Sequence, residues 1–159
     1  MLKNIPLLIL FLFGISSMTF SQNEEVSNEA EPTGVHFDGL YYAKTREVQI
    51  GDVVSEIYTY IRFKEDGTVY VQSVNADDPT AVAKWLGVDG KAERHGVYTL
   101  EGKELKFTVS NDDTVDQKLE GPKTDIYFGE LMGDNTLYLV VQSNSGDQMQ
   151  ILFKFAETE

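Results

Sequence analysis

Residues Ser55–Val74 read SEIYTYIRFKEDGTVYVQSV, and they contain the clearest structural signal in the chain. Two runs rich in β-branched and aromatic residues, 55–63 and 68–74, alternate apolar side chains with others, which is the period of a strand buried on one face. Between the runs lies Glu65-Asp66-Gly67, a polar turn whose glycine can adopt a positive φ angle. The segment therefore predicts an antiparallel β-hairpin.

Runs of the same kind continue along the chain, at residues 40–45, 96–100, 104–109, 125–132, 136–144 and 149–155. Short polar segments that contain glycine join several of them, at 101–103, 133–135 and 145–147. Successive hairpins form an antiparallel meander, and repeated strands at this spacing indicate an all-β barrel or sandwich.

Alternate positions of these runs are apolar except for Thr59 and Ser73. The set is Ile57, Thr59, Ile61, Phe63, Val69, Val71, Ser73, Leu105, Phe107, Val109, Leu137, Leu139, Val141, Ile151, Phe153 and Phe155. The intervening positions carry mostly polar residues and tyrosines. One face is therefore predicted to be core, and the other to face water.

A single helical signal lies between the strand runs, at residues 78–87. Asp78 can cap the helix, Pro79 suits its first position and Gly87 suits its end. Three apolar side chains fall on one face: Val82, Trp85 and Leu86. We expect this short helix to cap one end of a barrel, with Trp85 packed there.

The N-terminus has the features of a cleavable signal peptide, residues 1–21. Lys3 precedes the apolar run Ile5–Ile15, which is too short to span a bilayer, and small residues precede a cleavage site after Ser21. Residues 22–33 are acidic and poor in apolar side chains, which predicts a disordered tether before a domain at 34–159. We expect a periplasmic or secreted protein without a membrane span.

The chain contains no cysteine, so neither a lipid-anchor cysteine nor a disulfide is available. Its net charge is −13, and loss of residues 1–21 would remove one lysine and no acid. Such a surface repels phosphate backbones, which excludes nucleic acid and disfavours anionic membranes as partners.

Residues that could carry catalysis or bind a metal are few. The two histidines, His36 and His95, lie at the edge of the tether and just before a strand, and no nucleophile or metal-binding motif accompanies them. The acidic pairs lie in loop segments, and Asn111-Asp112-Asp113 lacks the ligand spacing of a calcium loop. We therefore expect no enzymatic activity, no catalytic residue, no metal and no cofactor.

Several segments together resemble exported bacterial lipocalin-like proteins of the calycin type. The residues that carry the resemblance are Asp38–Tyr41, Tyr60–Val69, Ala81–Trp85, Gly96–Gly102 and Gly133–Leu137. The resemblance implies an eight-stranded antiparallel meander barrel and, by analogy, a small apolar ligand in the lumen.

Two functions follow as alternatives. The first is a carrier of a small hydrophobic ligand, because a barrel of this size either fills with side chains or holds one small molecule. The residues predicted to line the lumen and its mouth are Ile61, Phe63, Val71, Trp85, Phe107, Leu139 and Phe153. The second is a structural or interaction module with a packed core, which would use the outward tyrosines Tyr58, Tyr60, Tyr70 and Tyr138.

Overall fold

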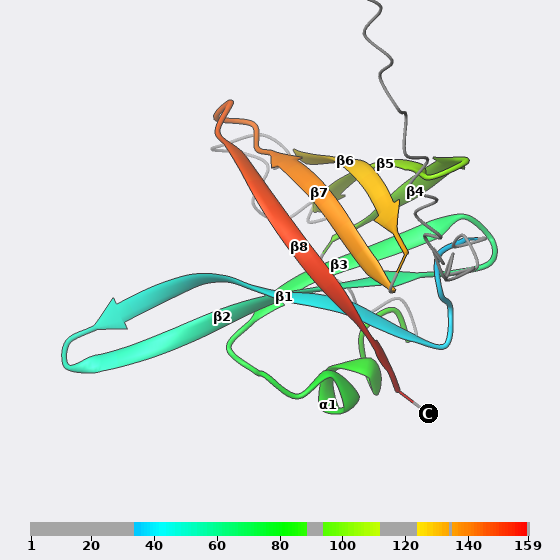
Figure 1. Ribbon diagram of the computed structural model, residues 1–159. Coiled ribbons are helices and arrows are strands. Elements are labelled where there is room, and N and C mark those ends of the chain that lie inside the picture. The colour runs from blue at the N-terminus through cyan, green and yellow to red at the C-terminus, as the bar shows by residue number, and fades with distance from the viewer. Residues whose placement is uncertain (1–33, 89–93, 112–123, 134, 159) are drawn as a thin grey trace, which may run out of the picture.

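The computed structural model describes residues 34–88, 94–111, 124–133 and 135–158 (Figure 1). The predicted signal peptide and tether, residues 1–21 and 22–33, lie outside these residues.

Eight strands form a closed barrel in which each strand pairs antiparallel with the next one in sequence, and β8 closes on β1. The strands are β1 (Gly39–Ile50), β2 (Val53–Phe63), β3 (Thr68–Val74), β4 (Arg94–Glu101), β5 (Glu104–Asn111), β6 (Thr124–Met132), β7 (Thr136–Gln142) and β8 (Gln148–Glu157). The predicted eight-stranded antiparallel meander barrel is confirmed.

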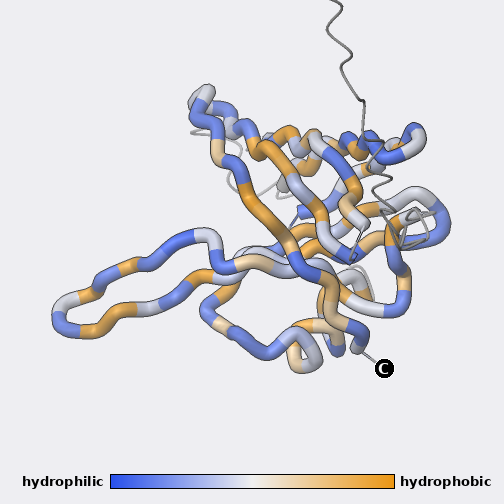
Figure 2. Tube along the Cα trace, viewed as in Figure 1, coloured by the Kyte–Doolittle hydropathy of each residue, from blue (hydrophilic) through white to orange (hydrophobic). Residues whose placement is uncertain are grey.

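The hairpin at residues 55–74 forms as the sequence predicts. In the β2–β3 ladder Ile61 lies opposite Val71, so both side chains point into the barrel. Gly67 has a φ angle of 87°, and the Asp66 carboxylate accepts a hydrogen bond of 2.9 Å from the backbone N–H of Thr68. The glycine and the acidic side chain thus set the turn that fixes the register. Figure 2 shows apolar and polar residues succeeding one another along such strands.

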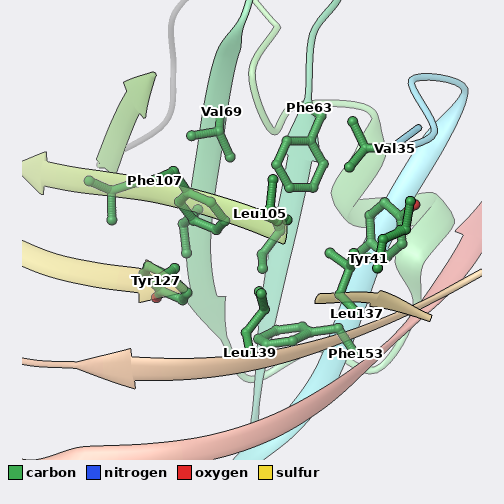
Figure 3. Close-up of a cluster of buried hydrophobic side chains, with 14 of the residues drawn as sticks. Val35, Tyr41, Phe63, Val69, Leu105, Phe107, Tyr127, Leu137, Leu139 and Phe153 are labelled. Atoms are coloured by element: carbon green, nitrogen blue, oxygen red, sulfur yellow. The ribbon is translucent and has the colours of Figure 1, made fainter. Parts of the chain in front are cut away.

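The lumen of the barrel is filled by its own side chains (Figure 3). Phe63, Phe107 and Phe153 are at most 2% exposed. Val35, which precedes β1, joins this core at one end of the barrel. At the same end the His36 ring stacks on Phe155, with ring centroids 4.4 Å apart. The segment before β1 therefore closes that end.

The short helix α1 (Pro79–Ala83) begins as predicted, because the Asp78 side chain accepts a hydrogen bond of 2.9 Å from the Thr80 N–H. It ends at Ala83, earlier than the predicted Leu86. On β2, Arg62 donates from Nη1 to the carbonyl oxygens of Ala83 and Leu86, at 2.9 Å each. This guanidinium thus ties the end of the helix to the barrel wall.

The position of α1 differs from the expected one, because the helix packs on the outer face of the barrel and not across its end. Leu40 and Tyr60, which point away from the lumen, form a second buried cluster with Val82, Ala83 and Leu86. The outward tyrosines of β1–β3 create an apolar area. Burying this area under the helix stabilises both the helix and the wall of the barrel.

The β1–β2 hairpin extends beyond the wall of the barrel, and Figure 1 shows it projecting to one side. β1 pairs with β8 only over Gly39–Tyr42, whereas its pairing with β2 continues to Ile50. Beyond Tyr42 the wall of the barrel is therefore split between β1 and β8.

Candidate functional site: a polar cup at one end of the barrel

Six of the seven predicted ligand-binding residues lie together inside the barrel, in the main core. They are Ile61, Phe63, Val71, Phe107, Leu139 and Phe153. Each is almost completely excluded from solvent. Trp85 is not with them, because it packs in the second cluster between α1 and the outer wall.

Aromatic rings occupy the space that a ligand in the lumen would need. Phe63 meets Phe107 edge to face at a centroid distance of 5.7 Å, and Phe107 stacks on Tyr127 at 4.6 Å. These are the separations of packed aromatic pairs. The residues expected to bind a ligand thus form the core that holds the barrel together.

A cavity of about 620 Å³ lies at the end of the barrel opposite Val35. We call it the cup. Its wall is formed by Thr45, Arg46, Thr59, Gln72, Ser73, Arg94, Asp125, Tyr127, Val141, Ser143, Asp147, Gln148, Met149 and Ile151. A volume of this size is typical of small-molecule sites.

One side of the cup carries a row of hydroxyl groups across three neighbouring strands. The Thr59 hydroxyl lies 3.0 Å from that of Thr45 on β1 and 2.8 Å from that of Ser73 on β3. Thr45 can also donate to the carbonyl oxygen of Ile57, 3.3 Å away. Because each hydroxyl both donates and accepts, the three groups can hydrogen-bond to one another and still offer lone pairs to a ligand.

The opposite side of the cup carries an ion pair. Nη2 of Arg94 lies 2.5 Å from Oδ2 of Asp125, and the side chains are only 20% and 22% exposed. The buried Nε of Arg94 has no hydrogen-bond partner among the described residues. A half-buried guanidinium with an unused donor can recognise a carboxylate, sulfate or similar group.

Tyr127 forms the floor of the cup, where it separates the polar groups from the core. Burial raises the pKa of its phenol to about 12, although nearby Arg94 acts in the opposite direction. The phenol is therefore neutral at physiological pH. The apolar part of the wall consists of Val141, Met149 and Ile151. The rest of it is polar, from Arg46, Gln72, Ser143, Asp147 and Gln148.

Sequence reasoning did not identify this site, although it contained one signal. Thr59 and Ser73 are the polar exceptions among the predicted inward positions, and both line the cup. Arg94, which directly precedes His95, carries no signal of a binding role in the sequence. In the structure His95 is on the outer face, with its ring centroid 6.3 Å from that of Tyr70.

The outward tyrosines do not form one free surface. Tyr60 is fully buried, and Tyr58 and Tyr70 pack in the same cluster beneath α1. Only Tyr138, on β7, is substantially exposed, at 38%. Three of the four residues proposed for an interaction face are thus used by the chain to hold its own helix.

Within the described residues, no group of three or more histidine, aspartate or glutamate side chains could hold a metal ion. The helix in this part of the chain is too short to cross a membrane. Comparison with known proteins finds no matching family, no matching curated protein and no matching solved structure. The function is therefore argued from the cup.

Proposed function

We propose that this chain is an exported, non-catalytic carrier that binds a small amphipathic molecule in the cup. The observation that carries the proposal is the combination, in one cavity of about 620 Å³, of a half-buried guanidinium with apolar side chains. The earlier hypothesis of an apolar ligand in the lumen has less support, because aromatic rings fill that space.

The polar groups would orient the head of the ligand. Arg94 offers directional donors to an anionic or strongly accepting head, and Asp125 keeps the guanidinium in place. The hydroxyls of Thr59 and Ser73 face the same space and can complete its hydrogen bonds. The body of the ligand would lie against Ile151 and its apolar neighbours, where burial contributes roughly 25 cal/mol per Å².

Anilinonaphthalene sulfonate, which combines an aromatic body with a sulfonate, is a suitable first probe. We expect its fluorescence to rise with the folded protein and the thermal midpoint to rise with dye concentration, because a ligand that binds only the folded form stabilises it. Arg94→Met should weaken binding by roughly 10- to 100-fold, the value of a hydrogen bond to a charged group. Asp125→Asn should strengthen it, because the variant removes a competing negative charge while its amide oxygen can still accept from the Arg94 guanidinium and hold it in place.

Lys106→Met is the matched control, since it removes a cation on the outer face of the wall. Equal dye affinity in the wild type, Arg94→Met and Asp125→Asn would rule out the cup as the site. The export part of the proposal is tested separately: the mass of the protein recovered from outside the cytoplasm should correspond to a chain that starts near Gln22.

A further inference from the structure

The split between β1 and β8 forms a window in the wall of the barrel. β8 pairs with β1 through Lys154 to Glu157, but its earlier residues pair only with β7. β1 leaves the wall after Tyr42 and continues with β2 into the projecting hairpin. Between the two unpaired edges lies a cavity of about 420 Å³.

This window and the cup are adjoining spaces. Three residues line both cavities: Thr45, Met149 and Ile151. Thr45 also belongs to the hydroxyl row that faces the proposed head-group position. The window and the cup thus share part of their wall, on β1 and β8.

Apolar residues line the window on both its inner and its outer side. Ala43 and Ile151, on the inner side, belong to or pack against the main core. On the outer side lies Leu152, which is 53% exposed and faces solvent beside the gap. Polar side chains also line the window: Lys44, Gln150 and Lys154. The apolar residues Ala43, Ile151 and Leu152 suit a hydrocarbon chain, because a chain that covers them removes apolar surface from water.

We infer that the ligand is an elongated, single-chain amphiphile, whose head lies in the cup beside Arg94 and whose chain leaves through the window between β1 and β8. This inference rests on the proposed function and adds the class of ligand to it. A compact ligand would use the cup alone, whereas an extended chain uses both cavities and the residues that they share.

Alkyl sulfates of increasing chain length, from hexyl to dodecyl and below their micelle concentrations, provide the test. We expect affinity, measured by displacement of the bound dye, to rise with each methylene, by up to roughly fourfold where burial is complete. Leu152→Gln should weaken the binding of dodecyl sulfate by about three- to tenfold, because part of the contact between the leucine side chain and the alkyl chain is lost. Hexyl sulfate, whose chain is half as long and is expected not to reach Leu152, should bind this variant as tightly as the wild type.

Val97→Gln is the matched control, because Val97 is 71% exposed on β4, away from the window. It should leave every affinity unchanged. Two results would contradict binding of the chain in the window: affinity that is independent of chain length, or an equal effect of Leu152→Gln on hexyl and dodecyl sulfate. Neither result would contradict binding of the head in the cup. If neither the dye nor hexyl sulfate binds the wild type, the cup itself is wrong and the inference fails with it.

Discussion

The hydroxyl oxygens of Thr59 and Ser73 lie 2.8 Å apart on the inner face of β2 and β3. Both residues interrupt an otherwise apolar inner face; Thr59 is only 5% exposed, whereas Ser73 is exposed. A buried hydroxyl is costly unless it is hydrogen-bonded, so the pair marks the level at which the core ends and the cup begins.

Replacing Thr59 by valine keeps the shape of the side chain and removes its hydroxyl. The neighbouring hydroxyls of Thr45 and Ser73 then lose a shared partner, and we expect the free energy of unfolding to fall by about 1–2 kcal/mol in urea denaturation. Thr108→Val, on the exposed outer face of β5, should stay within about 0.5 kcal/mol of the wild type. Equal losses for both variants would mean that the hydroxyl row contributes nothing specific.

Replacing Phe107 by alanine tests the filled lumen. Phe107 is 2% exposed and contacts two other rings, so its loss should lower the free energy of unfolding by about 3–5 kcal/mol. Lys106→Ala, one position away on the opposite face, should cost less than about 0.5 kcal/mol. A small effect at Phe107 would indicate an open lumen in solution and would favour the ligand position expected from the sequence.

Replacing Arg62 by methionine tests the attachment of α1. The two hydrogen bonds that its guanidinium donates to Ala83 and Leu86 would be lost, and we expect a cost of about 1–3 kcal/mol. Trp85 is the only tryptophan and packs beside the helix, so its emission should move toward that of an exposed indole. Unchanged emission and stability would show that the helix is held by its apolar contacts alone.

The stability of the barrel should decrease at alkaline pH through its buried phenols. Burial raises the pKa of Tyr41 and of Tyr127 from 10.0 to about 12. Because the folded state holds the neutral form more tightly than the unfolded state does, this stabilisation is complete below about pH 10 and is lost as pH rises toward 12. Urea denaturation between pH 9 and pH 12 should show the fall, and Tyr127→Phe should make it shallower. A free energy of unfolding that does not change over this range would contradict the stabilising role of the buried phenols.

The barrel could be predicted from local pattern because strand, turn and register are encoded over a few residues. Gly67 and Asp66 set one turn, and the alternation around Ile61 sets the face that is buried. The helix start was predictable for the same reason, since Asp78 caps a backbone N–H two residues away. Membership of the lipocalin-like proteins remains a prediction.

Local pattern in the sequence predicts an all-β chain, a meander of successive strands and the residues that point inward. The filled lumen, the position of α1 outside the wall and the cup between Thr59 and Arg94 emerge only in the folded chain. These depend on distances across the barrel between residues far apart in the chain. Arg94 on β4 and Asp125 on β6 meet across β5, with which both strands pair, and no local pattern records that contact between residues far apart in the chain.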